Sequence, residues 1–188
     1  PSKKIKKKDK AHIEKGPVTL EENIEQIDFY PVNEPFAYIK ILKDTETLEK
    51  YYKVIQPDLS EEEQEIFSFI QDKLIKTMDM RLDELDPTLS ENYLFEFMDQ
   101  ILRDHEIVVD DMLKRKLTYC VKKEFLGFGK IDPLMNDPNI EDISCDGSEI
   151  PIFLHHRKYG SVKSNINFNN EDELAAFVVN LAQKCGKH

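Results

Sequence analysis

The chain has 188 residues, of which 40% are hydrophobic and 34% are charged, and its formal net charge is −11. These values predict a folded protein with a highly charged surface and a chain long enough to bury a core. The acidic balance argues against nucleic-acid binding by the folded part, because an acidic body repels polyanions. Three widely spaced cysteines predict neither a metal-ligand pair nor a disulfide framework, which fits a reduced, cytoplasmic setting. We also expect no membrane span and no signal peptide.

The first residues are strongly basic. Residues 1–16 hold seven lysines against Asp9 and Glu14 and lack hydrophobic periodicity, so residues 1–18 are predicted to be a basic, disordered tail. The tail is either a solubilising end or a docking element for an anionic surface, to which each lysine contributes about 1 kcal/mol. Six of its lysines are candidates for such contacts: Lys3, Lys4, Lys6, Lys7, Lys8 and Lys10.

Residues 19–88 are predicted to form an N-terminal subdomain with a hairpin and a helix. Pro31 and Pro35 are expected to cut short any regular element at its start. The β-rich runs at 36–42 and 48–56 flank five polar residues, which predicts an antiparallel hairpin.

A helix is predicted to begin at Ser60. Ser60 and Glu63 form a capping box, in which each side chain accepts a hydrogen bond from the other residue's backbone. Apolar residues at helical spacing then run from Ile66 to Met78, and Pro87 is expected to break the pattern. Residues 89–188 are predicted to be a second, α+β domain. It opens with a helix near Ser90 and another over about 110–125.

The stretch "GFGK" that follows, residues 127–130, poses the question of a phosphate-binding loop. Such a loop needs G-x-x-x-x-G-K-[ST], because its backbone N–H groups wrap the phosphates and its hydroxyl holds Mg²⁺. Glu124 stands where the first glycine should be, and Ile131 stands where the hydroxyl should be. The glycines also follow a helix instead of a strand. The stretch is therefore predicted to be a helix C-terminus that runs into a turn.

Short β-patterns and one helix complete the chain. A helical turn is expected first, then a strand through Ile143 and Cys145, and then a strand over 150–156 whose Pro151 predicts an edge position. A further strand follows Gly160. The last helix is predicted to be capped by Asn170 and to turn the following residues inward: Leu174, Phe177, Val178, Leu181, Ala182 and Cys185.

No catalytic or metal site is predicted from these patterns. His155 and His156 are neighbours on a strand, so they point to opposite faces and cannot share a metal ion. No serine or cysteine lies in the strand–turn–helix context of a nucleophile elbow.

A family resemblance lies in the last third of the chain. Its residues are Gly129, Ile131-Asp132-Pro133-Leu134, Asp137, Ile140-Glu141-Asp142-Ile143, Asp146-Gly147, Pro151-Ile152, His156, Tyr159-Gly160, Asn165-Ile166, Phe168 and Gly186-Lys187. On these residues the chain resembles the N-terminal domain of type II and type IV secretion ATPases, specifically their archaeal branch of archaellum motor and pilus-assembly ATPases. The upstream runs "EPFAYIKI" and "LSEEEQEI" resemble the leading region of that branch more weakly.

The resemblance implies a fold and a role. It implies an α+β fold in which a segment with a hairpin and a helix precedes a small, PAS-like sheet domain flanked by helices. Members are hexameric ATPases whose N-terminal domains lie on a ring of RecA-like domains. ATP and Mg²⁺ bind between the N-terminal and the RecA-like domain, and rotation of the domains acts on an inner-membrane platform protein. The phosphate loop of the family lies further along than His188, so this chain is expected to be the N-terminal portion and no enzyme by itself.

The same resemblance suggests one nucleotide contact and four partners. Arg157 is the candidate for approaching bound nucleotide across the interface, and a surface arginine is the alternative. The expected partners are the chain's own RecA-like domain, five further copies, the platform protein and an anionic membrane surface, at a cytoplasmic, peripheral location. Nucleic acid is not expected. The alternative function is a stand-alone, PAS-like ligand sensor or protein-interaction module.

Overall fold

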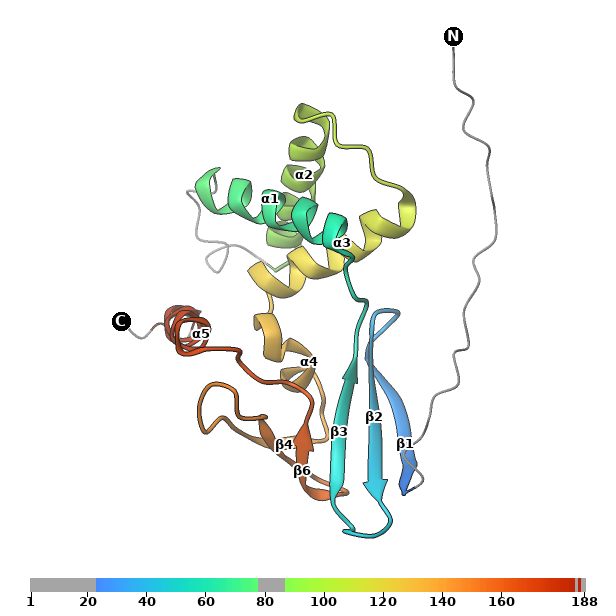
Figure 1. The fold of residues 1–188 in the computed structure, drawn as a ribbon. Helices are drawn as coiled ribbons and strands as arrows, with labels where there is room; N and C mark the ends of the chain where they lie inside the picture. Colours follow the sequence, from blue (N-terminus) through green and yellow to red (C-terminus); the bar gives the residue numbers. More distant parts are fainter. Residues whose placement is uncertain (1–22, 78–86, 185, 187–188) are drawn as a thin grey trace, which may run out of the picture.

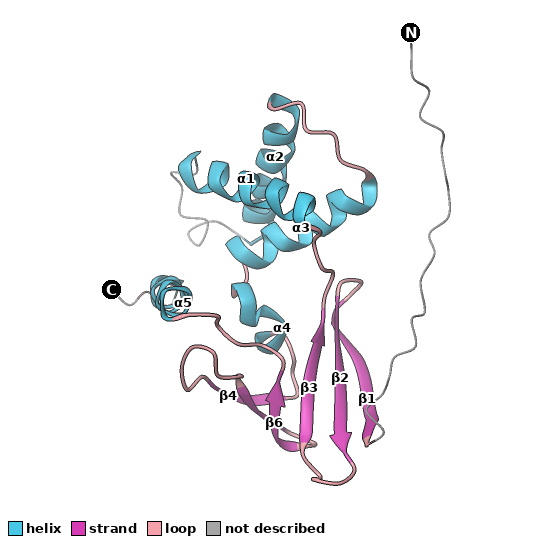
Figure 2. Ribbon diagram, in the orientation of Figure 1, coloured by secondary structure: helices cyan, strands magenta, loops and turns pink. Residues whose placement is uncertain are grey.

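The computed structural model describes residues 23–77, 87–184 and 186. A β-sheet forms the lower half of the molecule in Figure 1, and a bundle of three helices lies above it. The short helix α4 (Asp132–Met135) lies between the bundle and the sheet, and α5 (Glu171–Lys184) lies at the left of the view. The mixture of strands and helices confirms the predicted α+β class (Figure 2).

The sheet joins strands from both parts of the sequence. All neighbouring strands are antiparallel except β3 and β6, which are parallel and pair Tyr51 with Lys163. The early hairpin and the late strands therefore share one sheet. In order across the sheet, the strands are β1 (Ile24–Asn33), β2 (Ala37–Asp44), β3 (Lys50–Ile55), β6 (Gly160–Ser164), β5 (Phe153–His156) and β4 (Ile140–Ser144).

The predicted hairpin is confirmed, because β2 and β3 pair antiparallel from Tyr38 opposite Ile55 to Lys43 opposite Lys50. The expectation that Pro31 would cut short any regular element was wrong, because β1 continues to Asn33. Pro31 lies inside β1 and pairs with Tyr38, beside a register shift. A proline lacks the N–H donor, and this is tolerated because β1 is an edge strand, with no strand of the described residues on its outer side.

The edge position predicted from Pro151 was also wrong. β5 begins at Phe153, after the proline, and it lies between β6 and β4. The edge strand on that side is β4, which contains Ile143 as predicted but ends at Ser144, before Cys145. Pro151 removes no ladder hydrogen bond because it lies outside the strand, so it carries no information about the position of β5.

One face of the sheet is covered and carries the main core. Ile39, Ile41, Tyr52 and Leu154 are fully or almost fully buried on this face. α4 contributes Leu134 to the same core, and the core continues through Val162, Ile166 and Phe168.

The three long helices form a second core. α1 (Glu61–Thr77), α2 (Pro87–Asp104) and α3 (Asp111–Phe125) pack Ile70, Leu74, Leu94, Met98, Leu117 and Val121 against one another. The predicted capping box is confirmed, because the Ser60 backbone N–H donates to Glu63 over 3.0 Å and the Glu63 N–H donates to Ser60 Oγ over 3.2 Å. α2 begins at Pro87, ahead of Ser90, since proline fits the first turn of a helix. None of the helices within the described ranges is long and apolar enough to cross a membrane.

α5 differs from its predicted packing. Asn170 caps it as expected, because its Oδ1 accepts the Glu173 N–H over 2.8 Å. Leu174 and Phe177 pack against the sheet core, but none of the described residues of α5 is buried, and Val178 is 53% exposed. The inward face was wrong at Val178 because the helix touches the sheet along a narrow strip only. Cys185 lies outside the described residues.

Candidate functional site

The bundle and the sheet meet at the glycine segment after α3. α3 ends at Phe125, and the N–H groups of Leu126 and Gly127 both donate to the Lys122 carbonyl oxygen, over 2.9 and 3.0 Å. A Cβ atom on Gly127 would lie against Oδ1 of Asp132 and 2.8 Å from the Lys123 carbonyl oxygen. The glycine therefore lets Asp132 approach the end of α3, and the predicted helix C-terminus with a turn is confirmed.

Asp132 holds this junction together. Its Oδ1 accepts the Phe128 N–H over 2.9 Å, and its Oδ2 accepts Nδ2 of Asn136 over 2.9 Å. The Lys184 ammonium group, from α5, donates to the Gly127 carbonyl oxygen. We call residues 126–136 the joint, because α3, α4 and α5 all make contact within it.

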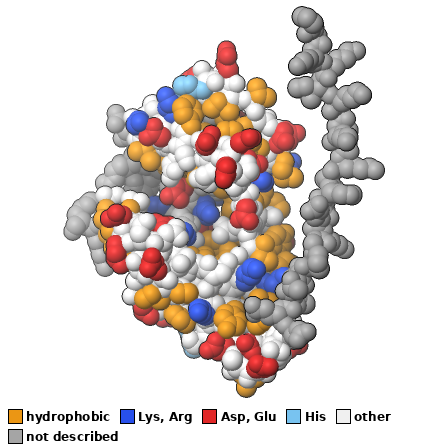
Figure 3. Space-filling model, viewed as in Figure 1, with side chains coloured by type: hydrophobic (Ala, Val, Ile, Leu, Met, Phe, Trp, Pro, Cys, Tyr) orange, Lys and Arg blue, Asp and Glu red, His pale blue; other side chains and the backbone are white. Residues whose placement is uncertain are grey.

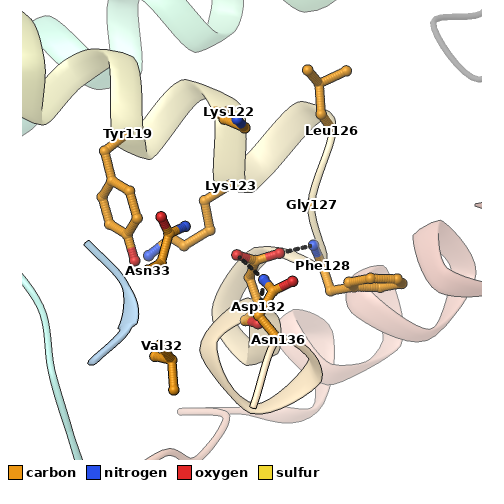
Figure 4. Close-up of a pocket in the computed structure, with 10 residues that line it drawn as sticks. All are labelled: Val32, Asn33, Tyr119, Lys122, Lys123, Leu126, Gly127, Phe128, Asp132 and Asn136. Carbon is orange, nitrogen blue, oxygen red and sulfur yellow. Dashed lines mark hydrogen bonds between the residues drawn. The ribbon is translucent and has the colours of Figure 1, made fainter. Parts of the chain in front are cut away.

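A hollow of about 430 Å³ opens beside the joint (Figure 4). Several of its polar side chains already have partners. Lys122 pairs with Glu91 at 2.8 Å, and both Lys123 and Tyr119 donate to Gln56, over 3.0 and 2.9 Å. The described residues that line the hollow are Val32, Asn33, Tyr119, Lys122, Lys123, Leu126, Gly127, Phe128, Asp132 and Asn136.

A second polar group lies inside the sheet core and is centred on Asp137, which is 3% exposed. The hydroxyl groups of Tyr30 and Tyr52 each donate to Oδ2 of Asp137 over 2.7 Å. Its Oδ1 accepts the backbone N–H of Asn139 over 2.8 Å. Nε2 of His156 lies 3.1 Å from the Tyr30 hydroxyl oxygen. We call Tyr30, Tyr52, Asp137 and His156 the polar cluster.

The hydrogen bonds of the cluster fix the tautomer of His156. The backbone N–H of Lys158 donates to Nδ1 over 3.0 Å, so this nitrogen carries no proton. The proton of the neutral ring is then on Nε2 and is donated to the Tyr30 oxygen, whose own proton goes to Asp137. Burial lowers the pKa of His156 in spite of the nearby carboxylates of Asp137 and Asp28.

The tyrosines of the cluster stay protonated. Burial raises the pKa of both Tyr30 and Tyr52, and the negative charge of Asp137 raises it further. Both hydroxyl groups therefore remain donors. The Asp137 carboxylate consequently connects β1 and β3 to the turn before β4, and His156 of β5 joins this group through the Tyr30 hydroxyl. The cluster carries no activated nucleophile.

A smaller group lies beside it at the edge of the sheet. Asp28 Oδ2 accepts the Tyr159 hydroxyl over 2.6 Å and lies 3.3 Å from the Lys158 ammonium group. The hydrogen bond from Tyr159 and the contact with Lys158 lower the pKa of Asp28. Among the described residues, no three His, Cys, Asp or Glu side chains are grouped as metal ligands.

Arg157, the nucleotide contact expected from sequence, lies apart from these groups. Arg157 is exposed, and its Nε donates to Glu141 over 3.1 Å at the β4–β5 edge, beside His155. Its proposed contact with nucleotide stays a prediction. His155 and His156 do face opposite sides of β5, since the first is exposed and the second is buried. Lys3, Lys4, Lys6, Lys7, Lys8 and Lys10 lie outside the described residues.

Sequence patterns do not predict the polar cluster. Asp137 and His156 are among the residues of the family resemblance, but Tyr30 and Tyr52 were not singled out. Their only local signal is a polar ring in a strand pattern, Tyr52 at a buried position and Tyr30 at a half-buried one. Their partner Asp137 is 107 residues away from Tyr30 and 85 residues away from Tyr52 in sequence.

Comparisons with known proteins connect the fold to a family. A family model described as "PilB3-like, N-terminal" matches residues 11–58, which include β1, β2 and β3. The uncharacterized protein MJ1288 of Methanocaldococcus jannaschii is 38% identical over 185 residues, which cover 96% of this chain and 73% of that protein. The uncharacterized protein MJ0900 of the same organism is 26% identical over 195 residues, which cover 90% of this chain and 34% of that protein.

The two relatives differ in how much of them lies outside the match. The chain spans nearly three quarters of MJ1288 but only about a third of MJ0900. The match over residues 11–58 supports the interpretation that this part of the chain is the N-terminal domain of a pilus-assembly ATPase. Because it is 38% identical to MJ1288 and covers 73% of that protein, this chain belongs to the same family as MJ1288.

Proposed function

We propose that this chain is the N-terminal coupling portion of a hexameric secretion-type ATPase that drives assembly of an archaeal pilus or archaellum. In this role it links ATP hydrolysis in a RecA-like domain to a membrane platform protein, at the cytoplasmic side of the membrane. ATP and Mg²⁺ are bound with the RecA-like domain, and this chain alone is no enzyme. The match of residues 11–58 to the PilB3-like N-terminal family carries the proposal.

The geometry of the joint supports a coupling role. The core of the bundle and the core of the sheet are connected at several places: the segment after α3, residues 56–60 before α1, and a third cluster that packs Ala37 of β2 against Tyr119 and Cys120 of α3. The Lys184 ammonium group of α5 contacts the Gly127 carbonyl oxygen within the segment after α3. A displacement of α5 is therefore transmitted directly to one of the connections between the two cores.

An uncoupling experiment tests this role in the protein made from the complete gene. Lys184→Met removes the ammonium group and keeps most of the length of the side chain. Lys76→Met is the control, because Lys76 pairs with Asp72 on the exposed side of α1. We expect Lys184→Met to retain ATP turnover and to lose filament assembly, while Lys76→Met retains both. Assembly at the unaltered rate in Lys184→Met would refute the coupling role of the joint.

The basic tail gives the proposal a second test. Its six clustered lysines, Lys3, Lys4, Lys6, Lys7, Lys8 and Lys10, each contribute about 1 kcal/mol near an anionic surface before the cost of ordering is subtracted. We expect the chain to co-sediment with vesicles that contain phosphatidylserine at low salt, and a chain without residues 1–16 to remain in solution. Equal binding by both forms would remove the tail from membrane recruitment.

The hollow beside the joint favours one alternative function, that of a ligand-sensing module. A volume of about 430 Å³ is within the range of small-molecule sites. The alternative predicts that a small molecule raises the melting temperature of the chain and that Asn136→Leu, which changes the lining, abolishes the effect. The coupling proposal predicts no such stabilisation by any small molecule of a screening collection.

A further inference from the structure

The face of the sheet opposite α4 and α5 carries a distinct set of side chains, which we call the open face. Successive side chains along a strand point to opposite faces of the sheet. In β2, β3, β5 and β6 the side chains of the open face alternate with buried side chains that point to the covered face. None of the described helices contributes to the open face. Its central side chains are Tyr38, Lys40, Tyr51, Lys53, Phe153 and Lys163.

Three lysines lie at the centre of the open face. Lys40 on β2 is directly opposite Lys53 on β3, and Lys163 follows on β6. Among the described residues, no carboxylate forms an ion pair with any of the three, whereas Lys116, for example, is paired with Glu63 at 3.0 Å. Like charges directly opposite on neighbouring strands destabilise a sheet. An anion bound between these ammonium groups would remove that repulsion.

Aromatic rings surround the lysines. Tyr51 and Phe153 are the direct cross-strand neighbours of Lys163, one on each side. Phe29 on β1 stacks on Tyr38 with ring centroids 5.5 Å apart and planes at 7°. Phe29 and Phe153 are both exposed. The open face thus offers ammonium groups to anions and apolar ring surface to hydrophobic side chains within the same few strands.

Carboxylates border the open face on two sides. Glu141 and Asp142 lie on β4, and Asp142 is opposite His155. Asp44 and Glu46 lie at the turn that joins β2 to β3. The positive area is therefore narrow. A long polyanion or a flat anionic membrane would meet these carboxylates as well as the lysines, and more carboxylates cover the bundle and α5 in Figure 3.

We propose that the open face binds a short acidic segment of a partner protein. Carboxylates of that segment lie between Lys40, Lys53 and Lys163, and its apolar or aromatic side chains pack on Tyr51 and Phe153. A short segment matches the narrow positive area, and mixed acidic and apolar side chains match the alternation of lysines and rings. This inference does not depend on the proposed function.

Binding of a fluorescein-labelled, short copolymer of glutamate and tyrosine tests the proposal. The test variant K40Q/K53Q/K163Q neutralises the three lysines. The matched control K73Q/K76Q/K114Q removes the same charge from α1 and α3. All substituted side chains are solvent-accessible, so both variants are expected to fold. From three partly exposed ion pairs we expect the test variant to lose about tenfold in affinity and the control to change by less than about twofold.

Two further experiments distinguish an acidic protein segment from a nucleic acid or a membrane as the ligand of the open face. In the first, the chain is titrated with oligothymidylate and with vesicles of phosphatidylserine and phosphatidylcholine. In the second, NMR follows the backbone amide shifts of the chain when the acidic copolymer is added. Shifts at Lys53 and Lys163 support the proposal. Equal losses in the two variants, shifts confined to residues 1–16, or tighter binding of oligothymidylate or vesicles through the same three lysines would overturn it.

Discussion

Asp137 is a carboxylate in the interior of the sheet, where an unpaired charge would be costly. Two tyrosine hydroxyls and one backbone N–H donate to it, so both of its oxygens have partners. Charge-assisted hydrogen bonds of this kind are shorter and stronger than neutral ones, in line with the 2.7 Å distances from Tyr30 and Tyr52. The stability of the sheet therefore depends on individual hydroxyl groups.

Tyr52→Phe tests this dependence. Removing the hydroxyl group leaves Oδ2 of Asp137 with one donor fewer, and we expect a loss of about 2 kcal/mol in the free energy of unfolding. Tyr51→Phe is the control, because the adjacent hydroxyl group bonds to Glu49 at the surface. Urea unfolding followed by circular dichroism measures both. A loss in Tyr52→Phe no larger than that in Tyr51→Phe would show that the cluster does not stabilise the fold.

His156 gives the stability a pH dependence. Its pKa is lowered in the folded protein, while in the unfolded chain it has its ordinary value of about 6.5. As the pH falls through about 6.5, the unfolded chain takes up a proton that the folded protein does not, so stability decreases. The carboxylates of Asp28 and Glu63, whose pKa values are lowered, lose their contribution only at more acidic pH.

Unfolding free energies measured between about pH 7 and pH 5 check this prediction. His156→Gln keeps an N–H donor for Tyr30 and cannot titrate, so we expect its stability to be flatter over this range. His155→Gln is the matched control, because it changes the exposed neighbour on β5 and leaves the buried His156 ring in place. The explanation fails if the slope persists in His156→Gln.

At the scale of elements, the joint depends on close approach. Gly127→Ala places a methyl group against the Asp132 carboxylate and the Lys123 carbonyl oxygen, so one of them must move. We expect a loss of about 1 to 3 kcal/mol, as for other overpacked positions. Ser148→Ala, at an exposed hydroxyl group that bonds to Glu171, is the control and should cost less than about 0.5 kcal/mol. Thermal unfolding compares them, and an unchanged melting temperature in Gly127→Ala contradicts the packing.

The elements that could be predicted from sequence are those with local signals. The caps at Ser60 and Asn170 place side-chain oxygens near N–H groups three residues away, and the structure has both. β1 was missed because the effect of Pro31 depends on whether the strand is an edge, and the pairing of distant strands decides this. The packing of α5 was overestimated for the same reason, since an apolar stripe does not reveal how much of it a neighbouring element covers.

At the scale of the whole molecule, the sheet joins the early strands β1, β2 and β3 to the late strands β4, β5 and β6. The parallel pairing of Tyr51 with Lys163 and the hydrogen bonds from Tyr30 and Tyr52 to Asp137 connect segments that are far apart in sequence. Such long-range pairings have no local sequence signal, so neither the single sheet nor the complete polar cluster could be predicted. The PilB3-like match covers the first half of this sheet, and the family resemblance covers the second half.

We propose that this chain works with an ATPase core in a longer protein. ATP turnover by the purified chain is therefore compared with turnover by the protein made from the complete gene. We predict no phosphate release by the chain above the blank, turnover by the complete protein, and a G-x-x-x-x-G-K-[ST] run after His188 in the complete sequence. Phosphate release by the chain alone, or a complete protein that has no such run and releases no phosphate, would contradict the account.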